Sequence, residues 1–174
     1  MTPEELQHCL EEAFGDLEPP YLEEVFESVD IDRFEAAIRT ETGRAKRWQE
    51  LRPLSQYQRF ALAVFILTPR AWQYYLPAYL YAMTDPEVVW CYLSPILSTL
   101  WYENEFGDLL GSHTPDRWEH RTALLTDRQR RCIAHFLVEL LKAIDDPSVD
   151  LSAEVDWEKD RIEHMLKKYW NAWL

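Results

Sequence analysis

The residues best suited to chemistry are His113, Asp116, Glu119 and His120, which lie close together in the chain. A helix that begins at Pro115 would bring the last three near one face, because residues three and four apart share a side of a helix. Imidazole and carboxylate ligands at this spacing resemble half of a metal site. No second set of ligands with matching spacing follows in the sequence. A metal-dependent enzyme that uses His113, Asp116 and His120 is therefore the alternative hypothesis.

The other patterns that mark catalysis are missing from the sequence. There is no pair of Glu-x-x-His motifs for a di-metal centre, no nucleophile elbow, no P-loop and no dinucleotide fingerprint. The three cysteines, Cys9, Cys91 and Cys132, lie far apart on apolar helical stripes, so we expect reduced thiols in the core. These features favour a non-catalytic protein without a cofactor.

The charge pattern favours binding to a basic partner. The formal net charge is −13, and residues 1–32 contain eleven Asp or Glu and no Lys or Arg. Such a surface repels nucleic-acid phosphates and anionic lipids, so we expect neither nucleic acid nor membrane as a partner. Aromatic anchors within an acidic rim suit a protein interface. The most specific version of this hypothesis is an immunity-type or antitoxin-type inhibitor of a basic partner. The alternative reading is that these acids only keep helix faces solvated. The candidate partner-binding residues are Glu11, Glu12, Asp16, Glu18, Glu23, Glu24 and Glu27.

A third hypothesis is a small-molecule-binding protein whose pocket is built from aromatic side chains. The stretch from residue 72 to residue 101 is the richest in them. The candidates are Trp72, Tyr75, Tyr79, Trp90 and Trp101.

The central element that would position these groups is the stretch TPRAWQYYLPAYLYAMTDP, from Thr68 to Pro86. Thr68 suits an N-cap, Pro69 suits the first helical position, and apolar residues then occupy most of the circumference. Pro77 lacks the N–H that would continue the ladder, so we expect a kink or a one-residue break there. We predict an all-α, single-domain bundle of about seven to nine helices over residues 1–174, with this proline-broken helix buried at its centre.

Capping boxes predict where other helices begin. Thr2 with Glu5 opens one near the N-terminus, and Thr126 with Gln129 opens a helix from Asp127 to Ile144. In that second helix Arg128, Arg130 and Arg131 lie near the N-terminus, where the positive end of the helix dipole disfavours cations. This indicates an acidic neighbour in the protein or on a partner. We also expect a short helix after Pro19-Pro20, with Tyr21 on its apolar stripe, and a terminal helix over about 153–172.

Location and assembly follow from hydropathy. The longest uninterrupted apolar run, residues 60–67, is far shorter than the roughly 18 residues of a spanning helix. The N-terminus is acidic and lacks the basic region of a signal peptide. We expect a cytoplasmic protein that is a monomer or a small homo-oligomer.

Several motifs together resemble a known family. They are Trp48-x-x-Leu51, Leu67-Thr68-Pro69, Tyr74-Tyr75-Leu76-Pro77-Ala78-Tyr79-Leu80, and Leu125-Thr126-x-x-Gln129-x-x-x-Ile133-x-x-Phe136-Leu137. In these the chain resembles an uncharacterised family of small bacterial all-helical proteins, a domain of unknown function with an LTP…YYLPAYL core. The resemblance covers roughly residues 5–143, and the helix after Asp150 looks like an extension. It implies a bacterial cytoplasmic helical domain and brings no activity or catalytic residue.

Overall fold

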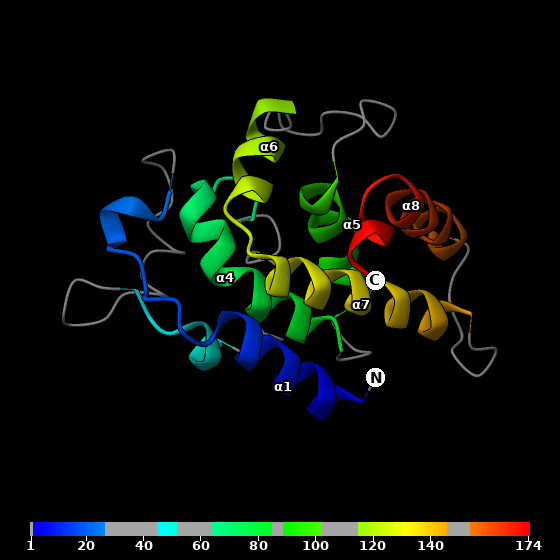
Figure 1. Cartoon of the computed structure of the whole chain (residues 1–174), viewed down its shortest axis with the longest axis horizontal. Helices are drawn as coiled ribbons and strands as arrows, with labels where there is room; N and C mark the ends of the chain where they lie inside the picture. Colours follow the sequence, from blue (N-terminus) through cyan, green and yellow to red (C-terminus); the bar gives the residue numbers. More distant parts are fainter. Residues whose placement is uncertain (1, 27–44, 52–63, 85–88, 102–114, 146–153) are drawn as a thin grey trace. The chain divides into compact units, whose positions relative to one another are not determined.

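The computed structural model describes residues 2–26, 45–51, 64–84, 89–101, 115–145 and 154–174 (Figure 1). All regular elements in these ranges are helices, which confirms the predicted all-α class. The described residues form six α-helices, fewer than the seven to nine that we expected. The α-helices are α1 (Pro3–Phe14), α4 (Pro69–Ala82), α5 (Val89–Leu100), α6 (Pro115–Ala123), α7 (Asp127–Ile144) and α8 (Glu154–Lys168). Three 3₁₀ turns accompany them: η1 (Leu22–Glu24), η2 (Trp48–Leu51) and η5 (Trp170–Trp173).

The chain divides into two compact units. The first, which we call the terminal unit, joins Met1–Gly15 to Leu125–Leu174 and so combines both ends of the chain. The second, the middle unit, is Asp16–Leu124. Among the described residues, no helix combines the length and the apolar character needed to cross a membrane.

In the terminal unit α7 packs against α1, α8 and η5 (Figure 1). Most of its apolar stripe is buried, as the helical period of the sequence predicts. The capping boxes predicted at Thr2 with Glu5 for α1 and at Thr126 with Gln129 for α7 are present, and a third, predicted at Ser55 with Gln58, lies outside the described residues. The core of this unit consists of Leu6, Leu10, Phe14, Ile133, Phe136, Leu137, Ile162, Met165 and Trp170, among others.

In the middle unit α4 packs against α5, α6 and η2. The predicted burial of α4 is confirmed. Of the two alternatives expected at Pro77, the break is wrong, because the helix runs from Pro69 to Ala82 with Pro77 inside it, and the kink stays a prediction. Pro77 cannot donate to a carbonyl one turn back, which costs about 3 kcal/mol in an ordinary helix. The side chains of Trp72, Tyr75 and Tyr79 are fully buried, and their packing offsets that cost.

The segment after Pro19-Pro20 also differs from the prediction. In place of a short α-helix it forms only the turn η1, and Phe26 then makes an isolated antiparallel bridge to Leu67. The bridge holds the chain extended where the apolar period alone indicated a helix. Trp48 and Leu51 in η2 are buried in the core.

Candidate protein-binding segment

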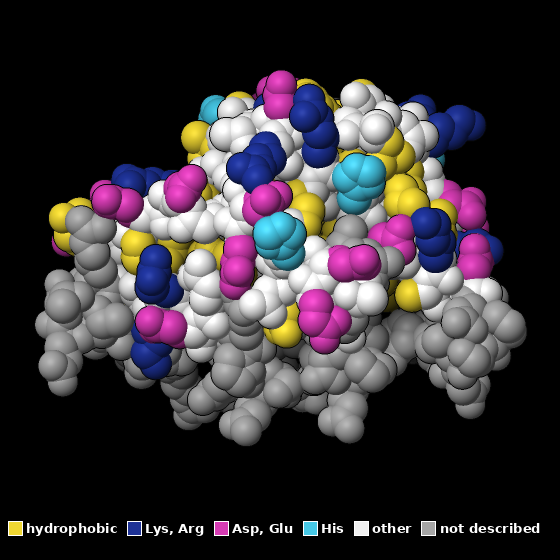
Figure 2. All heavy atoms as spheres, turned by 60° about the horizontal axis from the view of Figure 1, so that its bottom comes forward, with side chains coloured by type: hydrophobic (Ala, Val, Ile, Leu, Met, Phe, Trp, Pro, Cys, Tyr) yellow, Lys and Arg dark blue, Asp and Glu magenta, His cyan; other side chains and the backbone are white. Residues whose placement is uncertain are grey.

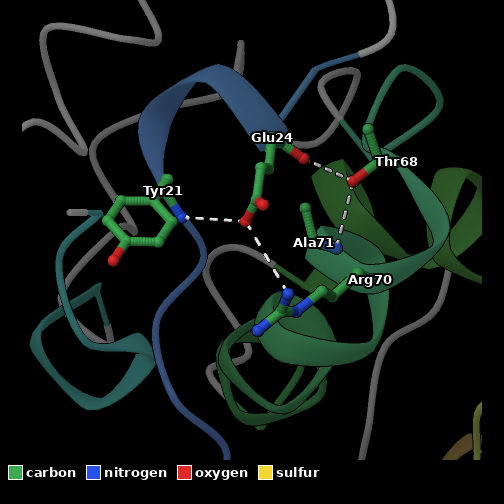
Figure 3. Close-up of polar contacts among 5 residues, drawn as sticks. All are labelled: Tyr21, Glu24, Thr68, Arg70 and Ala71. Atoms are coloured by element: carbon green, nitrogen blue, oxygen red, sulfur yellow. Dashed lines mark hydrogen bonds and ion pairs between the residues drawn. The ribbon is translucent and has the colours of Figure 1, made fainter. Parts of the chain in front are cut away.

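Residues 16–24, which we call the acidic segment, are tied through their C-terminal end to the start of α4. The hydroxyl of Thr68 donates to the carbonyl of Glu24 over 2.6 Å and accepts from the amide of Ala71 over 3.3 Å (Figure 3). The amide of Thr68 donates to the carbonyl of Val25 over 3.0 Å. Thr68 therefore caps α4 and holds the end of the acidic segment with the same side chain.

The carboxylate of Glu24 makes two contacts within the chain. It accepts from the backbone amide of Tyr21 over 3.3 Å and lies 3.8 Å from the guanidinium of Arg70 (Figure 3). Both charged side chains of this ion pair are partly exposed, so the pair contributes no more than about 1 kcal/mol. Glu24 shapes the turn, and it is only half-buried.

The acidic segment carries one exposed aromatic ring and three exposed carboxylates. The ring of Tyr21 lies on the side away from Thr68 and Arg70 (Figure 3), and Tyr21 is 48% exposed. Asp16, Glu18 and Glu23 are exposed on the same short stretch. Carboxylates accept from Lys and Arg, and a guanidinium also stacks on a tyrosine face. This arrangement can bind a cationic group, and it offers no nucleophile with a base.

The other predicted acids are placed differently. Glu11 and Glu12 are exposed on α1 in the terminal unit, where Glu11 accepts from Gln7 over 3.1 Å. Glu12 pairs with Arg128 at 2.9 Å and with His8 at 3.5 Å. Glu27 lies outside the described residues. The acidic neighbour that the arginines of α7 required is thus internal, at least for Arg128.

Charge on the visible surface is mixed. On the face in Figure 2, acidic side chains stand beside basic ones and beside histidines. In the terminal unit, Arg130 of α7 is 3.6 Å from Asp127 and lies over the ring of Trp173, with 4.7 Å between the guanidinium carbon and the ring centroid. Because acidic side chains also occur elsewhere on this face, carboxylates alone do not single out the acidic segment. The exposed ring of Tyr21 is its second feature.

The residues of the metal hypothesis are only partly described. Asp116 and His120 are both exposed on α6, and His113 lies outside the described residues. Within the ranges that the structure covers, no three His, Cys, Asp or Glu side chains gather as metal ligands would. Arg117 and Arg121 of α6 donate to backbone carbonyls of residues 64–67.

The aromatic residues of the small-molecule hypothesis belong largely to the core. Trp72, Tyr75 and Tyr79 are fully buried in the middle unit. Trp101 is half-buried and meets Trp118 edge to face, with ring centroids 5.7 Å apart. Nothing is described for the side chain of Trp90.

Sequence reasoning missed the exposure of Tyr21, because the helical period placed it on an apolar stripe with Leu22 and Val25. The signal that could have corrected this is Pro19-Pro20, since two successive prolines favour extended backbone before the turn. The sequence predicted Thr68 only as an N-cap. Nothing in the sequence indicated that its hydroxyl would also donate to the carbonyl of Glu24.

The chain belongs to a family of unknown function, DUF6714, whose model matches residues 2–174. This confirms the resemblance drawn from the LTP…YYLPAYL motifs. The match continues beyond residue 143, so it includes α8 and η5. No curated protein and no solved structure matches the chain.

Proposed function

We propose that this chain is a non-catalytic protein-binding module that takes a basic protein as its partner through the acidic segment. The observation that carries the proposal is the exposed ring of Tyr21 on the same nine-residue segment as the exposed carboxylates of Asp16, Glu18 and Glu23. In its sharpest form the module is an immunity-type or antitoxin-type inhibitor. It acts in the bacterial cytoplasm as a monomer or a small homo-oligomer, with neither nucleic acid nor membrane as its partner.

Electrostatics supports a basic partner. A net charge of −13 attracts cationic surfaces and repels phosphates and anionic lipid. Charges exposed to solvent are screened over about 8 Å at physiological ionic strength, so association should weaken as salt is added. This charge contributes to association rate and specificity more than to affinity.

The fixed backbone of the segment supports affinity. An aromatic ring contributes a large contact area, and Tyr is among the residues that dominate protein interfaces. The bonds from Thr68 to Glu24 and Val25 hold one end of the segment in place before any partner arrives. A surface that is ordered beforehand loses less conformational entropy when it binds.

Affinity capture from a lysate of the source cell tests the proposal. Three baits are immobilised: the unmodified chain, Tyr21→Ser combined with Glu23→Gln, and a matched control with Leu124→Ser combined with Glu119→Gln. The control also removes one exposed apolar side chain and one exposed carboxylate from the middle unit.

The expected result is a protein of positive net charge that the unmodified chain and the control retain at low salt. The Tyr21→Ser, Glu23→Gln bait should lose it. The proposal fails if no positively charged protein is enriched, or if both variant baits retain equal amounts of it.

A further inference from the structure

Two cysteines of the terminal unit meet at the contact between α1 and α7. The sulfur atoms of Cys9 and Cys132 are 2.6 Å apart, although 123 positions separate the residues in the sequence. Both are free thiols. The distance is longer than the roughly 2.05 Å of a disulfide bond, yet short enough that no other atom can lie between the two sulfurs.

The two thiols differ in access to solvent. Cys9 is half-buried on α1, whereas Cys132 on α7 is only 2% exposed. A small reagent from solution can therefore reach the sulfur of Cys9 first. Cys132 belongs to the buried core.

The two thiols also differ in acidity. The hydrogen bond with Cys132 lowers the pKa of Cys9, against the opposing effects of burial and of Glu12, and Arg128 lowers it further. The pKa of Cys132 is raised, because it shares that hydrogen bond and is buried. Cys9 is thus the more acidic thiol of the pair, and the thiolate is the nucleophilic form of cysteine.

We propose that Cys9 and Cys132 are a peroxide-reactive dithiol pair, in which Cys9 is oxidised first and Cys132 then closes an intramolecular disulfide between α1 and α7. This modification site is independent of the acidic segment. Disulfides in a reducing compartment are usually transient and redox-sensing, which fits a pair with one accessible member.

The chemistry takes place in two steps. The Cys9 thiolate attacks one oxygen of hydrogen peroxide, the O–O bond breaks, and the departing hydroxide takes a proton and leaves as water. Cys9 is then a sulfenic acid. The sulfur of Cys132 gives up its proton and attacks the sulfur of Cys9, and the sulfenic oxygen leaves as a second water. Two thiols lose two electrons to one peroxide. Two equivalents of a low-molecular-weight thiol then restore both cysteines by exchange and leave as their own disulfide.

Peptide mapping of the full chain tests this directly. Reduced protein is treated with hydrogen peroxide, alkylated and digested without reductant. We expect a cross-linked peptide pair containing Cys9 and Cys132, lighter by two hydrogens than the two thiol peptides. We also expect loss of two of the three thiols of the chain, with full recovery after dithiothreitol.

Variants assign the roles. Cys132→Ala should accumulate a sulfenic acid at Cys9 that dimedone traps, Cys9→Ser should form no disulfide within the chain, and Cys91→Ser should behave as the unmodified protein. The proposal is overturned if all thiols of the unmodified protein stay free at peroxide concentrations that oxidise free cysteine. It is also overturned if the disulfide involves Cys91 or joins two chains. Both of these outcomes are read on unmodified protein, so they do not depend on the folding of a variant.

Discussion

The buried side chain of Arg121 provides the strongest stability prediction. Arg121 is 2% exposed, and one of its terminal nitrogens lies 3.0 Å from the carbonyl oxygen of Leu67, 3.1 Å from that of Val64 and 3.4 Å from that of Phe65. Its guanidinium carbon is 5.6 Å from the centroid of the Trp72 ring. Arg121 therefore ties α6 to the stretch 64–67, which bridges to Phe26 near the acidic segment.

Replacement of this residue by methionine keeps the volume and removes the charged donor. A hydrogen bond to a charged group contributes about 1.5–3 kcal/mol, and the two shorter contacts account for most of the effect. We expect Arg121→Met to lower the free energy of unfolding by about 3–6 kcal/mol, the sum of two such hydrogen bonds. Arg121→Lys keeps the charge but not the planar fork of the guanidinium, so it should lower the free energy of unfolding by less than Arg121→Met does.

The assay is urea unfolding followed by tryptophan fluorescence, with Arg131→Met as the control. Arg131 is exposed on α7, so its replacement should change the free energy by no more than about 0.5 kcal/mol. Amide exchange over residues 16–26 should also become faster in Arg121→Met. A loss below about 1 kcal/mol, or one equal to that of the control, would refute the reasoning.

Three further predictions concern single contacts. Thr68→Val removes an N-cap and the tie to the acidic segment, so it should lower the free energy of unfolding by about 1–3 kcal/mol in thermal melts, while Thr68→Ser should restore most of it. Burial raises the pKa of Tyr75, so as pH rises the unfolded chain releases this proton first, from about pH 10. The free energy of unfolding should therefore fall as pH rises above that value. Tyr75→Phe should make this fall less steep in urea midpoints measured across the same pH range. Arg128 lowers the pKa of Cys9 and Glu12 raises it, so below that pKa Arg128→Ala should slow alkylation of Cys9 by iodoacetamide and Glu12→Gln should speed it; equal rates would contradict this prediction.

Features decided within a few residues could be predicted from the sequence. The capping boxes at Thr2 and Thr126 depend on side chains three positions apart, and the start of α4 depends on Thr68 and Pro69. The bounds of α7 follow from its capping box and its apolar period. The all-α class follows from many such local signals acting together.

Features decided by packing could not be predicted in the same way. A proline breaks an isolated helix, but burial of the side chains around Pro77 keeps α4 continuous. The bridge between Phe26 and Leu67 overrides the helical period after Pro19-Pro20. In both cases contacts between distant parts of the chain outweigh local preference.

Pairings between residues far apart in the chain also could not be predicted from the sequence. The partner of Glu12 is Arg128, and the partner of Cys9 is Cys132, although nothing in the spacing of these residues links them. The candidate site was predicted only as a set of acids. The structure adds Tyr21, whose exposure depends on how the turn η1 is held.

The most direct test of the binding proposal is photo-crosslinking in the source cell. A photoreactive phenylalanine analogue replaces Tyr21 in one strain and Leu124 in another, two positions that are 48% and 43% exposed in the same unit. We expect position 21 to form a covalent adduct with a protein of positive net charge, and position 124 to form none with that protein. The account is contradicted if position 21 gives no adduct above that at position 124, or if its adduct is with an acidic protein or a nucleic acid.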